Sequence, residues 1–247
     1  MAVDEAILRA VAAGQVPTTL RLYAWEPGCL SLGRAQPADD VDWQALAAAG
    51  FDIVRRPTGG KAILHVDELT YSVVVPEAEP RVGGGIVDSY RRLSAGLVRG
   101  LERLGVTDLV ADQRAGNRQS EGPVCFEMPS DYEITAGGRK LAGSAQMRAR
   151  SAVLQHGAVP IHGDITRICP LLTAHPDPGR VRARATTIEE MLGRAAAWRE
   201  VADAMVAGFA EALNLRLEPG TLTDGERAVA QRLRVEKYAT GEWNKRV

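Results

Sequence analysis

The sequence predicts a single α+β domain. Two observations carry this prediction. The expected strands and helices follow one another without the strict alternation of a doubly wound sheet, which argues against a Rossmann fold. The 247 residues are 45% hydrophobic and 25% charged, which is ordinary for a globular chain that buries its own core. Neither an internal repeat nor a long linker divides the chain, so we expect one domain over residues 1–247.

Short elements make up the first part of the chain. A helix is expected from Asp4 to about Ala13, because apolar residues recur there at helical spacing, and Gly14 is expected to end it. Asp42 is expected to cap a short helix that ends at Gly50. Alternating or continuous apolar runs predict strands at residues 19–25, 29–33, 51–56, 61–65 and 69–75.

Two longer helices are expected further along. Over residues 87–104 one apolar stripe is formed by Tyr90, Leu93, Leu97, Leu101 and Leu104. Residues 187–190, Thr-Ile-Glu-Glu, have the pattern of a capping box. The apolar spacing from Trp198 to Leu213 continues from this box, so we expect one long helix that starts near Thr187.

A hairpin and a loop are expected between these helices. The glycine pair at 137–138 separates residues 131–135 from 139–148, which is typical of a β-hairpin, and residues 152–161 predict a further strand. Over residues 111–122 the composition becomes polar and includes glycine, which predicts a mobile loop and suggests a lid over a site.

Charge and cysteine content exclude several classes of function. The net charge of −1 provides no global basic field for nucleic acid. Three cysteines without close pairs argue against a disulfide framework and against a metal cluster. The chain has no 18-residue apolar run, and its acidic start lacks the pattern of a signal peptide. We therefore expect a soluble, cytoplasmic protein with no metal and no membrane partner.

Cys125 is the strongest candidate nucleophile. It lies in a polar segment flanked by proline and glycine, whereas Cys29 and Cys169 lie among apolar residues and are expected to act as small hydrophobes. A free thiol has a pKa of about 8.5, so little of it is ionised at neutral pH. Lys140, which begins a run of small residues, is the candidate to hold the thiol as thiolate, because a nearby ammonium favours the charged form.

Three segments carry candidate binding groups. In residues 55–65 two glycines let backbone N–H groups approach a ligand, and adjacent cations favour a carboxylate or phosphate. Residues 143–146 and 155–157 offer small residues and polar contacts. Taken singly, each segment is more typical of a tight turn or of a structural histidine. The candidate substrate-binding residues are Arg55, Arg56, Thr58, Gly59, Gly60, Ala62, His65, Gly143, Ser144, Ala145, Gln155, His156 and Gly157.

These segments form a larger pattern along the chain. The pattern consists of Arg-Arg-Pro-Thr-Gly-Gly at 55–60, Glu-Leu-Thr-Tyr-Ser at 68–72, and the segments 125–133, 138–146, 154–157 and 237–244. Together they resemble the biotin and lipoate protein ligase and octanoyltransferase superfamily, and within it the LipM-type octanoyl-[acyl carrier protein]:protein N-octanoyltransferases. The resemblance covers nearly the whole chain.

For the fold, the resemblance implies a mixed β-sheet flanked by helices, as in the catalytic domains of class II synthetases and biotin protein ligases. Members of the family usually carry a strand before the segment that matches residues 1–6. That strand is missing from this sequence, so a trimmed or misassigned start is expected.

For the activity, the resemblance implies a two-step acyl transfer. Cys125 would attack the thioester of octanoyl-acyl carrier protein, and a lysine of a lipoyl-domain protein such as the glycine cleavage H protein would then take the acyl group as an amide. Thioester exchange is nearly balanced and amide formation is downhill, so neither ATP nor another cofactor is expected. Lys140, carried over from the family, would lower the pKa of the thiol.

Two parts of the implied site stay open. Backbone N–H groups at 143–145 or at 59–60 are equally candidates for an oxyanion hole. The apolar residues Ala62, Leu64 and Leu154 are candidates for the wall of an acyl channel.

Three other functions compete with the transferase. A lipoyl-domain amidotransferase would also use a cysteine but would take octanoyl from another lipoyl protein. An ATP-dependent lipoate–protein ligase would use the same glycine-rich loop and Lys140 without a cysteine. A non-catalytic acyl-binding module would tolerate the loss of Cys125. The cysteine and the absence of a second C-terminal domain favour the transferase.

Overall fold

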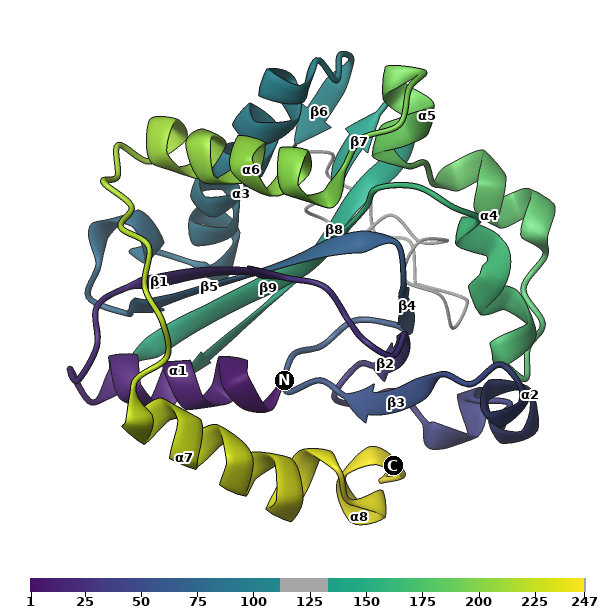
Figure 1. The fold of residues 1–247 in the computed structure, drawn as a ribbon, viewed down its shortest axis with the longest axis horizontal. Helices are drawn as coiled ribbons and strands as arrows, with labels where there is room; N and C mark the ends of the chain where they lie inside the picture. Colours follow the sequence, from purple (N-terminus) through teal and green to yellow (C-terminus); the bar gives the residue numbers. More distant parts are fainter. Residues whose placement is uncertain (112–132, 247) are drawn as a thin grey trace.

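Two β-sheets form the centre of the protein, which a computed structural model describes over residues 1–111 and 133–246 (Figure 1). The strands are β1 Thr19–Tyr23, β2 Cys29–Leu32, β3 Asp52–Arg55, β4 Ile63–His65, β5 Glu68–Pro76, β6 Leu109–Ala111, β7 Ile134–Ala136, β8 Arg139–Ala149 and β9 Ala152–Pro160. The large sheet has six strands in the order β1-β5-β9-β8-β7-β6, with every neighbouring pair antiparallel. The small sheet has the order β3-β2-β4, and its β2–β3 pair is parallel.

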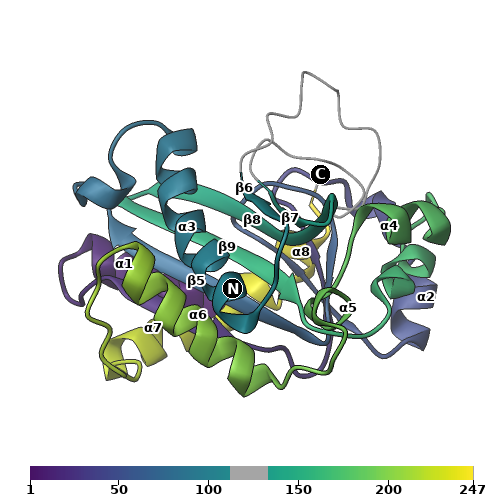
Figure 2. The same ribbon diagram turned by 90° about the horizontal axis from the view of Figure 1, so that it is seen from above.

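Helices cover both faces of the large sheet and the outer side of the small one. They are α1 Ala2–Ala12, α2 Trp43–Ala48, α3 Ile86–Leu104, α4 Pro178–Arg184, α5 Ile188–Leu192, α6 Trp198–Ala212, α7 Asp224–Leu233 and α8 Gly241–Asn244. Helices α3 and α6 lie on one face of the large sheet, and α1, backed by α7, lies on the other (Figure 1). Helices α2 and α4 flank the small sheet (Figure 2). The α+β class, with sheets flanked by helices, is confirmed.

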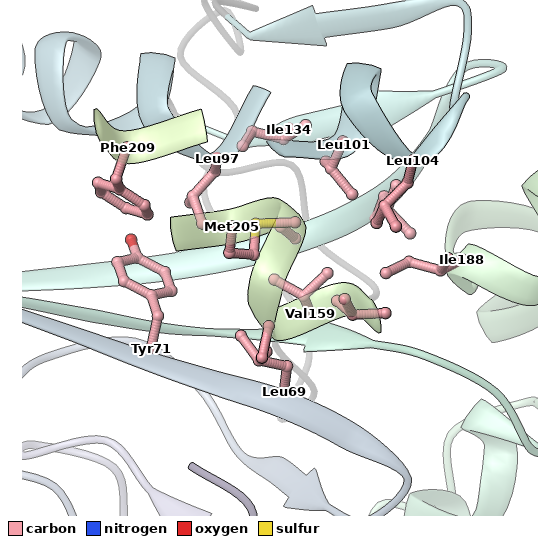
Figure 3. Close-up of a cluster of buried hydrophobic side chains, with 14 of the residues drawn as sticks. Leu69, Tyr71, Leu97, Leu101, Leu104, Ile134, Val159, Ile188, Met205 and Phe209 are labelled. Atoms are coloured by element: carbon pink, nitrogen blue, oxygen red, sulfur yellow. The ribbon is translucent and has the colours of Figure 1, made fainter. Parts of the chain in front are cut away.

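The main core lies between the large sheet and helices α3 and α6. Strand β5 is buried on both faces, and its residues Leu69 and Tyr71 point to this core while Val74 points to α1. Leucines of α3 and the side chains of Met205 and Phe209 on α6 meet them from above (Figure 3). The apolar stripe predicted on residues 87–104 is therefore the buried face of α3.

Helices α3 and α6 touch backbone to backbone. A Cβ atom built on Gly208 would lie 2.2 Å from the backbone nitrogen of Gly100, so only glycine permits this crossing. The close contact keeps the two helices in one layer above the sheet.

The long helix expected from Thr187 is wrong. The chain forms α5 and α6 as separate helices because Gly193 adopts the left-handed conformation, with φ of 64°, and ends α5. Thr187 does cap α5 by accepting from the backbone N–H of Glu190, but the Glu190 carboxylate accepts from Thr186 and from Arg139. A complete capping box stands elsewhere, at the start of α7.

The sequence patterns also left several elements unassigned. Helices α4, α7 and α8 and the 3₁₀ segment Ile165–Leu171 are short or polar and show no clear apolar period. The expected hairpin is present as β7 and β8. The loop expected over residues 111–122 lies, apart from Ala111, outside the described residues. No helix in the described part of the chain is long and apolar enough to cross a membrane.

Candidate active site

A pocket that opens to solvent lies where the two sheets meet. Its floor comes from β8, β9 and β5 of the large sheet, and its cover from β4 and the loop that precedes it. The lining residues are Met1, Arg56, Gly59, Gly60, Ile63, His65, Thr70, Gly143, Ser144, Ala145, His156, Gly157 and Ala158. The structure therefore brings together most of the residues predicted to bind substrate, from three segments far apart in the sequence.

The floor of the pocket requires glycine at position 157. Strands β8 and β9 pair so that Ser144 lies opposite Gly157. A Cβ atom at this position would lie 2.4 Å from the carbonyl oxygen of Gly143 and 2.7 Å from Ser144 Oγ. A larger residue would force the strands apart, so the glycine keeps the floor flat and the pocket open.

Gln155, which was predicted to bind substrate, does not line the pocket. Its Nε2 donates to the hydroxyl of Tyr71 at 3.0 Å, and that hydroxyl donates to Ser144 Oγ at 2.7 Å. Burial raises the pKa of Tyr71 to about 12, so it stays a neutral donor. Gln155 thus holds Ser144 from the core side and does not line the pocket.

Arg56 shapes the cover of the pocket from within. Its guanidinium donates to the carbonyl oxygen and the hydroxyl of Ser31, and on its other side to the carbonyl oxygens of Gly59 and Lys61 at 3.2 and 2.8 Å. The residue is 3% exposed. These bonds curl the glycine loop back on itself, so the arginine shapes the loop that faces a ligand.

Arg55 and Ala62, which were also predicted to bind substrate, do not line the pocket. Arg55 is fully buried, and its guanidinium donates to the backbone carbonyls of Gly33, Gln36 and Asn244. It is a structural anchor because its donors are used by the protein. Ala62 is fully buried in the core beside α2 and α4.

His156 belongs to a buried charged network on the floor. Its Nε2 lies 2.6 Å from the hydroxyl of Thr58, and its Nδ1 lies 3.7 Å from the carboxylate of Asp4. That carboxylate also accepts from Arg21 at 2.8 Å and from Tyr23 at 2.9 Å. Thr58 does not itself line the pocket, and its hydroxyl contacts the lining residue His156.

The pKa values of both His156 and Asp4 are lowered, for different reasons. Burial lowers the pKa of His156, and this outweighs its attraction to Asp4, so the imidazole is neutral at physiological pH. Burial alone would raise the pKa of Asp4. The nearby His156 imidazole, 3.7 Å away, and the positive charges of the amino terminus and Arg21 outweigh it and hold that pKa well below its usual range.

His65 belongs to a second buried network on the cover. Its Nε2 lies 2.6 Å from Ser31 Oγ, and its Nδ1 lies 2.6 Å from the carboxylate of Glu68. The Trp25 ring stacks on the imidazole at 4.5 Å, and the indole N–H donates to the hydroxyl of Thr70 at 2.8 Å. Thr70 in turn donates to Glu68. Both ring nitrogens of His65 are thus engaged while the ring edge lines the pocket.

Lys140 is buried next to a carboxylate that sequence reasoning missed. Its Nζ donates to Glu133, and the two side chains are 3% and 6% exposed. The lysine lies on β8 three residues before Gly143, which is about 10 Å along a strand. Cys125, the predicted partner of Lys140, lies outside the described residues. The only local clue to Glu133 was the hairpin that places it near Lys140.

The other two cysteines behave as predicted. Cys29 and Cys169 are buried. Burial raises the pKa of the Cys29 thiol to about 12, so this thiol stays protonated at neutral pH.

The apolar wall is formed by other residues than those predicted. Leu154 packs against α1 on the far face of the sheet, and Leu64 packs against the core of the small sheet. Ile63, Ala145 and Ala158 line the pocket in their place. The wall is lined by small or apolar groups and glycine backbone, and its two histidines are bonded to neighbours, so the pocket suits an uncharged, chain-like ligand.

Comparisons with known proteins agree with this geometry. The family model "Lipoyl protein ligase A/B catalytic domain" matches residues 1–210. An octanoyltransferase LipM from Kyrpidia tusciae is 44% identical over 100% of this chain and 93% of its own length. Another octanoyltransferase LipM, from Symbiobacterium thermophilum, is 43% identical over 100% of this chain and 93% of its own length.

Among solved structures, lipoate-protein ligase A bound with ATP superposes with a TM-score of 0.82 and 28% identity, covering 99% of this chain and 92% of that one. The likeness extends over both sheets and therefore over the pocket.

Proposed function

The chain belongs to the lipoyl protein ligase A/B catalytic-domain family, and we propose that it works through an octanoyl thioester on Cys125. It is an acyltransferase, an octanoyltransferase of lipoate biosynthesis, because its LipM relatives match it over the full chain at more than 40% identity. These relatives favour the transferase over the amidotransferase, the ligase and the non-catalytic binder. The observation that carries the proposal is the apolar pocket that opens on β8, the strand that also carries the buried Lys140 about 10 Å from the lining residue Gly143.

In the first step, the Cys125 thiolate attacks the thioester carbonyl of the donor. A new carbon–sulfur bond forms, the old one breaks, and the donor leaves as a thiol after taking a proton. The Lys140 ammonium, which is paired with Glu133, would stabilise the thiolate. The acyl chain would extend over the small residues of β8 and β9, where Ala145 and Ala158 leave it room.

In the second step, an amine of the acceptor attacks the acyl-enzyme. A carbon–nitrogen bond forms, the cysteine leaves as thiolate, and the amine releases its extra proton. Amide formation is downhill from a thioester, so the reaction would need no ATP and no other cofactor. Backbone N–H groups at 143–145 or at 59–60 would stabilise the oxyanion, since both segments border the pocket.

The partners are an acyl donor and a lipoyl-domain acceptor in general terms. Our proposal is narrower and names octanoyl-acyl carrier protein as donor and a lysine of a lipoyl-domain protein, such as the glycine cleavage H protein, as acceptor. It also places the reaction in the cytoplasm.

Intact-protein mass spectrometry after mixing the protein with octanoyl-acyl carrier protein, without ATP or acceptor, tests the proposal. We expect one octanoyl adduct on the wild type and none on Cys125→Ala, because that substitution removes the nucleophile. The buried Cys29→Ala variant is the matched control and should still form the adduct. A lipoyl-domain acceptor should release the adduct.

Two other results would change the assignment. An adduct that forms only from an octanoylated lipoyl protein would identify an amidotransferase. ATP-dependent acylation that survives in Cys125→Ala would identify a ligase.

A further inference from the structure

Arg55 joins the last helix to the end of β3. Its backbone N–H donates to Asn244 Oδ1 at 2.8 Å, and its guanidinium donates to the carbonyl oxygens of Trp243 and Asn244 at 3.2 and 3.0 Å. The Trp243 indole N–H returns a bond to the Arg55 carbonyl oxygen at 2.9 Å. Helix α8, which carries both partners, lies beside β3 (Figure 1). The backbone and the side chain of one buried arginine are therefore held by two consecutive residues.

Helix α8 is itself held firmly. The Thr240 hydroxyl caps it by accepting from the backbone N–H of Trp243 at 3.2 Å, and Asn244 Nδ2 donates to the carbonyl oxygen of Tyr238 at 2.9 Å. Lys237 lies over the Trp243 ring at 4.0 Å and donates to Glu5 of α1 at 2.6 Å. This short helix can therefore transmit a fixed position to Arg55.

The peptide that follows Arg55 is the first of the pocket loop. Its carbonyl oxygen accepts from Trp243, and its N–H, on Arg56, donates to the carbonyl oxygen of Leu32 at 2.8 Å. The plane of this peptide is thus set from both sides. It sets the direction in which residues 56–60 leave β3, and within that stretch Arg56, Gly59 and Gly60 line the pocket.

We propose that Trp243 and Asn244 are positioning residues for the substrate loop over residues 56–60. Within the described structure, their hydrogen bonds to this part of the chain all go to Arg55, so they act on the reaction through the loop. The expected effect on the rate of adduct formation rests on the proposed function, whereas the expected effect on the loop does not. Loosening α8 should let the loop open locally while the two cores stay folded.

The test compares Trp243→Phe with Trp198→Phe. The first variant keeps an aromatic ring but removes the bond to the Arg55 carbonyl. The indole nitrogen of Trp198 is buried without a hydrogen-bond partner in the described structure, so its removal costs no bond. Asn244→Ala is a harsher variant, because it leaves the buried N–H of Arg55 without its acceptor.

Two readouts separate positioning from stability. Amide hydrogen exchange at Arg34, which donates to Thr58 at 2.8 Å, and at Arg56 reports opening of the loop. Formation of the Cys125 adduct reports the reaction. In Trp243→Phe we expect loop exchange to become faster and adduct formation slower, each by about threefold to tenfold, which corresponds to the loss of one net hydrogen bond. Exchange in β5 and β9 should change little. Trp198→Phe should leave the loop exchange and the adduct rate at wild-type values.

Two results would overturn the proposal. Unchanged loop exchange and an unchanged adduct rate in Trp243→Phe would show that the bond does not position the loop. A uniform rise in exchange over the whole protein would show that α8 only adds global stability. If the wild type forms no adduct at all, the proposed function fails, and loop exchange still decides whether α8 holds the loop.

Discussion

The two buried histidines on either side of the pocket have the same order of partners but different electrostatics. Each imidazole lies between a hydroxyl and a carboxylate, Ser31 and Glu68 for His65, Thr58 and Asp4 for His156. On the cover, His65 has both ring nitrogens 2.6 Å from oxygen partners. On the floor, His156 has one nitrogen at that distance and the other 3.7 Å from the carboxylate.

The difference teaches that a hydroxyl–imidazole–carboxylate series is not by itself a catalytic triad. Ser31 also accepts from Arg56, and both hydroxyls are buried, so neither is presented to a ligand as a nucleophile. The floor network carries its charge on Asp4 and Arg21, while the carboxylate of the cover network accepts from an imidazole and a hydroxyl. Both networks hold pocket walls in place, and the floor network pairs the fully buried Asp4 with the partly exposed cation of Arg21.

The sharpest test of this comparison is Asp4→Asn against Glu68→Gln. Asp4→Asn removes the charge that compensates Arg21 and should cost about 3 kcal/mol of unfolding free energy, at the low end for breaking a buried ion pair. Glu68→Gln should cost about 1 kcal/mol, because it weakens hydrogen bonds without isolating an arginine. Urea unfolding of both variants measures the difference, and equal losses would contradict the distinction.

The next effect is a loss of stability in acid. The folded pKa of His156 is lowered, so below about 6.5 the unfolded chain binds a proton that the folded protein refuses. The contribution of His156 to stability is therefore full above that pH and should be lost at up to about 1.4 kcal/mol per pH unit below it. The lowered pKa of Asp4 adds a further loss only below about pH 4.

Unfolding free energies at several pH values between 4 and 8 check this slope. His156→Gln should flatten it between pH 6.5 and 4, since the group that titrates is gone. His162→Gln, at an exposed histidine, is the matched control and should keep the wild-type slope. A slope that survives in His156→Gln would place its origin outside the floor network.

The smallest expected effect concerns an exposed ion pair, which serves as a reference for the loss of unfolding free energy at Asp4. Arg199 and Asp203 form an ion pair at 3.0 Å on the surface of α6, with side chains 82% and 61% exposed. Arg199→Ala should change the unfolding free energy by less than about 0.5 kcal/mol, because water screens such a pair. A loss at Asp4 no larger than this one would mean that burial of the floor network has little energetic weight.

Much of the fold was predictable because it follows from local periodicity. The apolar stripe of α3, the continuous apolar run of β5 and the glycine turn between β7 and β8 each have a short-range cause. The short polar helices were missed because their stability comes from caps and tertiary contacts. The break between α5 and α6 depends on a single glycine, Gly193, which the apolar spacing outweighed.

The segments that line the pocket were predictable, but the hydrogen bonds and ion pairs that hold them were not. Glycines marked the lining because few other residues let backbone approach a ligand, and histidines marked it because they can supply polar contacts. Asp4 was missed because an acidic residue in the first turn of a helix ordinarily interacts with the helix dipole in water. Arg55 was assigned to ligand binding because its partners on α8 lie 188 and 189 residues away, beyond any local pattern.

The separation of Arg55 from α8 along the chain affects when the substrate loop can be fixed during synthesis. Asn244 follows Arg55 by 189 residues, and ribosomes add about 5 to 20 residues per second, so about ten to forty seconds pass between them. Throughout that interval the nascent chain carries an arginine whose partners on α8 do not yet exist. The sheets can pair and the cores can form before then, whereas the substrate loop acquires its final anchor among the last events of folding.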